Sequence, residues 1–166
     1  EDRKGQGLVL AQSIRTNLIL ANMKGFSTGM FLNEKKIEDA GQKNIASLRI
    51  KTPSIDEIVG QLSGGNQQKV VIGKWVNTDA DIFIFDEPTR GIDVGAKVEV
   101  YNVMNSLVKQ GKCVIMVSSE MPEILGMSDR VIVMRGGEVM AEVDRDSEHF
   151  NQEDLMKAAW GGKLDD

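Results

Sequence analysis

The sequence predicts an α/β fold in which a parallel sheet is followed by a β-hairpin. Two short runs of β-favouring residues, 82–85 and 112–117, have the pattern of buried strands. The amphipathic segment 95–110 between them has the spacing of a helix, and this alternation favours parallel strands joined by a crossover. Gly136 and Gly137 then separate two further apolar runs, as expected for a hairpin turn.

The first third of the chain predicts mainly helices. Residues 1–7 form a charged loop broken by glycine, and apolar side chains then recur mostly at helical spacing. Asn33 is a candidate N-cap for one of these helices, and another begins near Gly65. The predicted helical segments are, in order, 8–24, 33–48, 55–59 and 67–77.

The character of the chain changes after residue 77. We therefore divide it into a mainly helical subdomain, residues 1–77, and an α/β part, residues 78–166. Gly111 is a suitable stop for the amphipathic helix before the second strand. The remaining predicted elements are a short helix at 122–125, strands at 131–134 and 138–143, and a terminal helix at 151–160.

Composition excludes several classes of protein. The 166 residues carry 20 Lys and Arg against 25 Asp and Glu, a net charge of −5, so a broad basic face for nucleic acid is not expected. No apolar run reaches about 18 residues, the length needed to span a membrane. The single cysteine, Cys113, cannot form an internal disulfide and is expected to be a small buried apolar residue.

Two adjacent carboxylates follow the first predicted strand. The strand delivers Asp86 and Glu87 to its carboxyl end, where α/β sheets bind ligands. A carboxylate there can hold Mg²⁺ through water beside nucleotide phosphates, and its neighbour can polarise an attacking water. Taken alone, the pair is explained equally well as a strand that leads into an acidic turn.

A second pattern, Ser63-Gly64-Gly65, precedes a predicted helix. Two glycines allow close approach of the main chain to a ligand, and the start of a helix presents free N–H groups at the positive end of its dipole. Ser63 adds a hydroxyl. The pattern therefore suits a phosphate, although a capped helix after a flexible turn has the same residues.

The two patterns in this order resemble the ATP-binding-cassette family of transporter ATPases. The matching motifs are Leu62-Ser63-Gly64-Gly65, the signature; Asp86-Glu87-Pro88-Thr89, the Walker B segment; and Gly91-Ile92-Asp93, the D-loop. The resemblance implies a helical subdomain followed by the C-terminal part of a RecA-like P-loop NTPase core with a mainly parallel sheet. It also implies that Glu87 is catalytic and that Asp86 holds Mg²⁺. The residues that it implies for nucleotide contact are Leu62, Ser63, Gly64, Gly65, Asn66, Gln67, Asp93 and Ser119.

A narrower resemblance is carried by three strings. Residues 1–4, 89–97 and 118–123 are similar to the second cassette of the tandem ATPases of ribose, galactose and xylose importers. This implies part of an ATP-hydrolysing subunit that powers import of a simple sugar, with ATP and Mg²⁺ bound in the intact protein. The implied partners are the first cassette of the same polypeptide, integral membrane permease subunits and, indirectly, an extracytoplasmic sugar-binding protein. The implied location is peripheral, at the cytoplasmic face of the cell membrane, with no nucleic acid partner.

Three departures from the family pattern modify this expectation. No Gly-x-x-x-x-Gly-Lys-Ser/Thr loop occurs, and in the family that loop lies before the position of Glu1, so we expect a truncated cassette that is inactive alone. The family's glutamine between the subdomains falls at about Glu1. The switch histidine is replaced by Ser119, which cannot carry positive charge to a phosphate, so the site with Glu87 is expected to be weak. The alternative is a soluble cassette ATPase of DNA repair or translation that has no permease.

Overall fold

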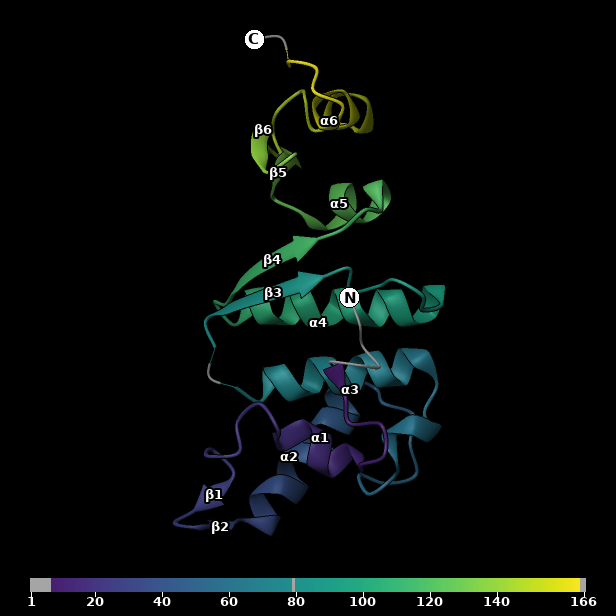
Figure 1. Cartoon of the computed structure of the whole chain (residues 1–166), viewed down its shortest axis with the longest axis vertical. Helices are drawn as coiled ribbons and strands as arrows, with labels where there is room; N and C mark the ends of the chain where they lie inside the picture. Colours follow the sequence, from purple (N-terminus) through teal and green to yellow (C-terminus); the bar gives the residue numbers. More distant parts are fainter. Residues whose placement is uncertain (1–6, 79, 165–166) are drawn as a thin grey trace. The chain divides into compact units, whose positions relative to one another are not determined.

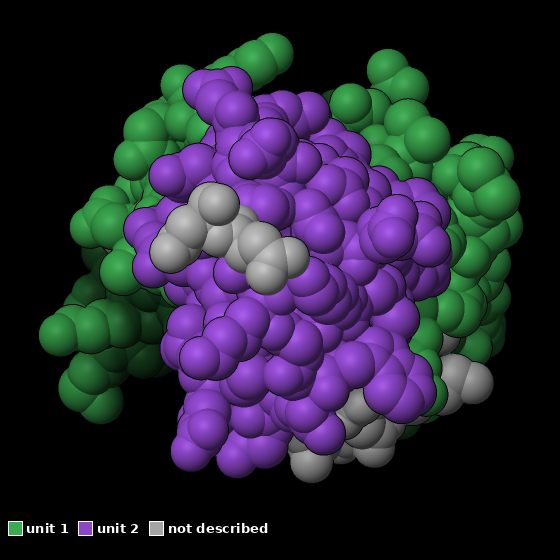
Figure 2. All heavy atoms as spheres, turned by 90° about the horizontal axis from the view of Figure 1, so that it is seen from above, with its two compact units in different colours: residues 1–115 green, residues 116–166 purple. Residues whose placement is uncertain are grey.

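The computed structural model describes residues 7–78 and 80–164. The chain divides into two compact units, residues 1–115 and 116–166, coloured separately in Figure 2. Helices and strands of the first unit are α1 (Ile14–Ile19), β1 (Ser27–Thr28), β2 (Phe31–Leu32), α2 (Glu34–Ser47), the 3₁₀ turn η2 (Val59–Gln61), α3 (Gly64–Val76), β3 (Ile82–Asp86) and α4 (Val94–Lys109). Strand β4 (Cys113–Val117) crosses the division, and the second unit continues with α5 (Met121–Met127), β5 (Arg130–Arg135), β6 (Glu138–Asp144) and α6 (Gln152–Ala159) (Figure 1).

The first helix is much shorter than the predicted segment 8–24. Helix α1 begins after Ser13, whose hydroxyl accepts a hydrogen bond from the Thr16 amide at 3.2 Å. The residues before it pair instead with a distant part of the chain: Val59 N donates to Gln12 O at 3.0 Å, and Gly60 N donates to Leu10 O at 2.9 Å. The apolar spacing of residues 8–12 was therefore not evidence of a helix, because their main-chain groups have partners across this ladder.

A small hairpin follows α1 that the sequence did not predict. Strands β1 and β2 pair antiparallel, with Ser27 opposite Leu32 and Thr28 opposite Phe31. Gly29 has φ +64° in the connecting turn, a conformation that glycine adopts without strain. The predicted helix 33–48 is confirmed as α2, and its N-cap Asn33 accepts from the Lys36 amide at 3.0 Å.

Close helix packing and a buried amide hold α1, α2 and α3 together. A Cβ atom on Gly73 of α3 would lie only 2.8 Å from a methyl carbon of Leu18, so the absence of a side chain sets this approach. The buried Asn44 amide of α2 donates to Ala40 O and to Asn77 Oδ1, both at 2.8 Å. This polar group satisfies its donors inside an apolar core, which fixes how the helices meet.

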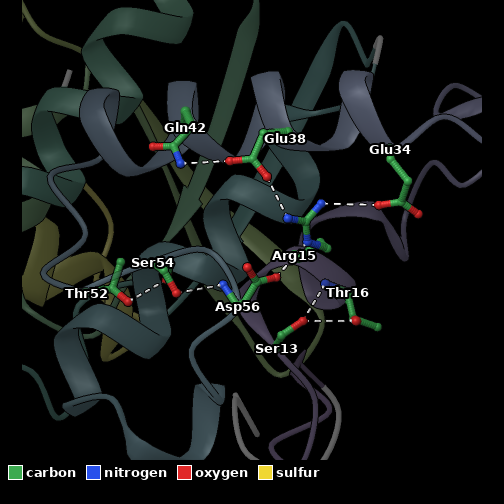
Figure 3. Close-up of polar contacts among 9 residues, drawn as sticks. All are labelled: Ser13, Arg15, Thr16, Glu34, Glu38, Gln42, Thr52, Ser54 and Asp56. Atoms are coloured by element: carbon green, nitrogen blue, oxygen red, sulfur yellow. Dashed lines mark hydrogen bonds and ion pairs between the residues drawn. The ribbon is translucent and has the colours of Figure 1, made fainter.

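Arg15 joins three segments on the surface of the helical region. Figure 3 shows its guanidinium directed toward two carboxylates of α2 and one in the chain segment that precedes η2. Arg15 nitrogens lie 3.3 Å from Glu34 Oε2, 2.6 Å from Glu38 Oε2 and 2.8 Å from Asp56 Oδ1. Hydrogen bonds that Arg15 donates to Asp56 and Glu38, led by that to Asp56, raise the pKa of Arg15 above its ordinary value, so the cation is retained at all relevant pH values.

Strands β3 and β4 form a two-stranded sheet, and their arrows point the same way in Figure 1. Both strands were expected to be buried, and this expectation was wrong for the described residues. In β3, Phe83 is buried, whereas Ile82 and Ile84 are 60% and 70% exposed. Cys113 in β4 is exposed as well, contrary to its expected burial, because it lies on the alternate face that the described residues leave uncovered.

The second unit is built on the predicted hairpin. Strands β5 and β6 pair antiparallel from Arg130 opposite Asp144 to Arg135 opposite Glu138, and Gly136 and Gly137 both have positive φ in the turn. Helix α6 covers one face of this hairpin. The buried residues of this core are Val131, Val133, Val143, Leu155 and Ala158.

The sheets recorded among the described residues are three separate pairs, β1–β2, β3–β4 and β5–β6. The mainly parallel sheet expected from the alternation of elements is thus represented there by β3–β4 alone. The compact units divide the chain after Ile115, whereas the sequence pattern changes near residue 77. The predicted subdomains, 1–77 and 78–166, remain a prediction. No described helix has the length and apolar character required to cross a bilayer.

Candidate nucleotide site

The predicted phosphate-binding turn lies at the start of α3. Ser63 is the N-cap: its backbone is extended, and its Oγ accepts from the Asn66 side-chain amide at 3.0 Å and, more weakly, from the Asn66 backbone N at 3.5 Å. Asn66 Oδ1 accepts in turn from the Lys51 amide at 3.0 Å. Ser63 is exposed and can still donate its hydroxyl proton, so the helix N-terminus offers N–H groups and one O–H to an anion.

Gln67 holds this turn from inside the protein. Its Nε2 donates to Val59 O and to Leu62 O, both at 3.2 Å, and the residue is buried. Its side chain is thus turned to the main chain beneath the turn, and nucleotide contact by Gln67 remains a prediction. Gln67 ties Leu62 and η2 to the first turn of α3, which sets the direction from which Ser63 approaches.

The D-loop residue Asp93 lies against the same turn. Asp93 is the N-cap of α4, and its Oδ1 accepts from the Ala96 amide at 3.0 Å. A Cβ atom on Gly65 would lie 3.0 Å from Ala96 Cβ and 3.7 Å from Asp93 Oδ2. The structure thus brings Gly65 and Asp93 together, and it adds a reason for glycine at position 65: a Cβ there would be in tight contact with Ala96 at the first turn of α4.

Asp86 and Glu87 occupy the end of β3 as predicted. Asp86 is the exposed last residue of the strand, and Glu87 has φ +47°. A residue with a side chain rarely adopts this left-handed conformation, and such strained positions cluster at functional sites. The buried Pro88 and Thr89 that follow anchor the turn. The main chain at Glu87 is therefore held by an anchored turn at the end of β3.

An open hollow of about 890 Å³ lies beside these carboxylates in the first unit. Asp86, Glu87 and Arg90 line it together with Lys74 and Trp75 of α3. Burial lowers the pKa of Lys74, and its Nζ lies 5.1 Å from the centre of the Trp75 ring. Side chains of both charges, from Lys74 and Arg90 and from Asp86 and Glu87, thus line the same hollow in the first unit.

Asp86 could hold a divalent metal ion only together with a bound nucleotide whose phosphates also coordinate the ion. No group of three or more His, Cys, Asp or Glu side chains within residues 7–78 and 80–164 is placed to hold a metal ion. Mg²⁺ in nucleotide sites is commonly held by one or two carboxylates together with phosphates and water. An exposed Asp86 at a strand end fits that role, in which phosphate oxygens complete the metal's coordination.

Ser119 lies in the second unit, in the loop between β4 and α5. It is exposed, whereas its neighbours hold the loop: Glu120 N donates to Ser118 Oγ at 3.0 Å, and the Ser118 hydroxyl contacts the buried Glu123 carboxylate. Glu123 Oε1 has no hydrogen-bond partner within the described part of the chain. The sequence singled out Ser119 as a candidate site residue. It gave no sign that Glu123 is buried, because a single glutamate in a short helix is usually exposed.

A family model described as "ABC transporter" matches residues 6–90, about half of the chain. The chain is 51% identical over 162 residues to the ribose import ATP-binding protein RbsA of Oceanobacillus iheyensis, which is 98% of this chain and 32% of that protein. It is 53% identical over 164 residues to the xylose import ATP-binding protein XylG of Moorella thermoacetica, again 98% of this chain and 32% of that protein. The chain therefore spans about a third of the length of the curated relatives that it matches.

Solved structures give the same fold at much lower identity. A dimeric ATP-binding cassette bound to ADP and phosphate superposes with a TM-score of 0.71 and 20% identity, covering 84% of this chain and 60% of that one. A nucleotide-free cassette from an ABC transporter gives a TM-score of 0.70 at 19% identity, covering 89% and 59%. The described residues therefore have, in part, the α/β fold of these cassettes.

Proposed function

The chain belongs to the ABC transporter family, and from this premise we propose that it is part of the ATP-hydrolysing subunit of an importer of a simple sugar. The single observation that best supports the proposal is the junction of Gly65 with the Asp93 turn, where two motifs named from sequence lie in contact distance. Relatives named as ribose and xylose import ATP-binding proteins, about half identical over nearly the whole chain, support the sugar-import role.

We propose that the turn at Ser63–Gly65 completes an ATP site whose phosphates are held by another cassette. The Ser63 hydroxyl and the free N–H groups of the first turn of α3 would bind the terminal phosphate, and the helix dipole favours that negative charge. Leu62, Gly64 and Asn66 shape the turn, and Gln67 fixes it from below. Asp93 would sit beside the same nucleotide at the junction of the cassettes.

We propose that Asp86 and Glu87 serve this chain's own nucleotide. Asp86 would hold Mg²⁺ through water, and the ion, when bound, would neutralise charge on the phosphates. Glu87 would orient and polarise the attacking water from its strained position at the end of β3. Ser119 in place of a switch histidine makes this site the weaker of the two, since a hydroxyl provides no cation.

The proposed function also implies the partners of the chain. The chain would be the second cassette of a tandem polypeptide, pairing with the first, and the pair would drive integral membrane permease subunits from the cytoplasmic face of the membrane. An extracytoplasmic sugar-binding protein would act indirectly. The relatives favour this role over a DNA-repair or translation ATPase, since those cited are named for sugar import.

Substitution of Gly65 tests the proposal in the full-length protein that carries this chain. Gly65→Asp places a Cβ against Ala96 Cβ and adds a negative charge at the phosphate-binding turn, so ATP hydrolysis and sugar uptake should fall by about 100-fold or more. Gly126→Asp is the matched control, because Gly126 is exposed and a Cβ there meets open space. Unchanged rates in Gly65→Asp, or equal losses in both variants, would contradict the proposed site.

A further inference from the structure

Lys69 is a buried cation in the helix that carries the phosphate-binding turn. It lies four residues after Gly65, one helical turn along α3, and is 4% exposed. Its Nζ donates to Arg49 O at 2.7 Å and forms an ion pair with the Glu99 carboxylate of α4. A buried ammonium group is costly unless it is paired and hydrogen-bonded, so these two partners account for its presence there.

Each partner belongs to a different segment. Arg49 follows the end of α2 and has φ +50°, a left-handed conformation uncommon for a residue with a side chain. Its carbonyl is directed to Lys69 in that conformation. Glu99 lies in α4, six residues after the N-cap Asp93. Lys69 therefore links the end of α2, the helix that begins at Gly64 and the helix that begins after Asp93.

The Lys69–Glu99 pair adds to a second close approach between α3 and α4. That approach is the one of Gly65 to Ala96, and the ion pair lies one turn further along both helices, from residue 65 to 69 and from 96 to 99. Approaches at two levels along a pair of helices restrain both the rotation and the sliding of one helix against the other, which a single approach does less well.

We propose that Lys69 is a positioning residue that locks the Ser63–Gly65 turn to the Asp93 turn through Glu99. The inference rests on the proposed function, in which both turns act on one nucleotide at the junction of two cassettes. Movement of either turn is then transmitted to the other, because a change in the angle between α3 and α4 would separate Glu99 from the buried ammonium group of Lys69. Lys69 does not itself contact substrate in this arrangement.

The chain offers a matched comparison in Lys112. Lys112 Nζ lies 2.8 Å from Asp81 Oδ1, but Asp81 is exposed and the pair joins the starts of β3 and β4. Exposed pairs of this kind contribute little to stability. Lys112→Met therefore removes a lysine–carboxylate pair of the same chemistry from the same unit without touching α3 or the N-terminus of α4.

The experiment compares Lys69→Met, Lys69→Arg, Glu99→Gln and the double variant Lys69→Met/Glu99→Gln with Lys112→Met, all in the full-length protein. Lys69→Met should lower kcat for ATP about tenfold, with binding of a fluorescent ATP analogue unchanged, because the turn is displaced by a small distance and not removed. Lys69→Arg, which keeps the charge, should recover most of the rate. The double variant should be no slower than Lys69→Met.

Hydrogen exchange supplies a second readout that does not depend on hydrolysis. Lys69→Met should speed amide exchange both at 63–66 and around Asp93, and Lys112→Met should change neither. A Lys69→Met protein that matches Lys112→Met, a loss in melting temperature with unchanged kcat per folded molecule, or additive losses in the double variant would each overturn the coupling. A wild-type protein without ATPase activity would overturn the proposed function instead, and the exchange measurement would still decide the coupling.

Discussion

The helical region and the β3–β4 sheet differ in how far their apolar side chains are buried. In the helical region, most large apolar residues of α1 to α3 are buried, with Trp75 of α3 an exception; Ile14, Leu18 and Val70 are almost fully enclosed, and the buried amide of Asn44 has partners for its donors. In β3, the neighbours of buried Phe83 on both sides, Ile82 and Ile84, are mainly exposed. The first region is complete in its own packing, and the second is covered on one face by the described residues.

This difference teaches how far a hydrophobic pattern can be interpreted. In a helix, apolar spacing selects one face, and that face must find cover for the helix to be stable. A strand that is apolar at every position encodes cover on both faces, as in sheets of α/β proteins. The sequence of β3 therefore predicts cover on both faces of the strand, whereas the described residues cover only the face that carries Phe83.

The largest expected difference is in the loss of stability caused by the same substitution, Ile→Thr, made once in each region. Ile14→Thr puts a hydroxyl into a fully enclosed site and removes a methylene, so it should lower the free energy of unfolding by about 3 kcal/mol. Ile84→Thr keeps the β-branch at an exposed site and should cost less than about 0.5 kcal/mol. Urea unfolding followed by Trp75 fluorescence, in a Trp160→Phe background, measures both. Equal costs would mean that β3 is enclosed as fully as α1.

A polar substitution in the helical core should have the next largest effect. Asn44→Asp replaces a donor by an acceptor opposite Ala40 O and Asn77 Oδ1, at a cost of about 2 kcal/mol near pH 7. Burial would raise the pKa of the new carboxyl above its unfolded value of about 3.9, so the cost should be smallest below pH 4, where the acid is protonated, and should grow as the pH rises. Asn44→Leu, without a titrating group, should give a loss that does not vary with pH. A flat profile for Asn44→Asp would contradict the buried network.

The ion-pair cluster of Arg15 should contribute less than the core. Arg15→Gln leaves Glu34, Glu38 and Asp56 without their shared cation, and we expect a loss of about 1 kcal/mol, since all three carboxylates are largely solvated. The loss should shrink as salt is raised, because exposed charges are screened. Chemical denaturation by urea at low and high NaCl measures this. A loss that salt does not change would show that packing of the side-chain stem, and not charge, explains the effect.

The smallest effect is expected at the edge of the sheet. Hydrogen bonding and charge from Lys112 lower the pKa of Asp81, so this carboxyl stabilises the folded state above its unfolded pKa and ceases to do so as pH falls through the folded value. Lys112→Met should therefore be slightly less stable than wild type near neutral pH, and the two should converge below about pH 4. Divergence toward acid pH would contradict the assigned pair.

Local elements were predictable because their causes are local. The N-caps Asn33 and Ser63 fix where α2 and α3 begin, and Gly136-Gly137 marks the β5–β6 turn. The ladder between residues 10–15 and 55–60 was not predictable, because its partners are forty or more residues apart. The link from Lys69 to Glu99 was missed for the same reason, and the burial of Gln67 depends on a fold that no local pattern reports.

The central claim is that the Ser63–Gly65 turn acts on a nucleotide whose phosphates are held elsewhere. Its most direct test is calorimetric titration of Mg-ATP into the purified 166-residue chain, with a thermal melt to verify that the chain is folded. The sequence contains no phosphate loop with its lysine, so we predict no binding at micromolar ATP. A one-to-one isotherm with micromolar affinity would contradict the account, because the chain would then hold the triphosphate by itself.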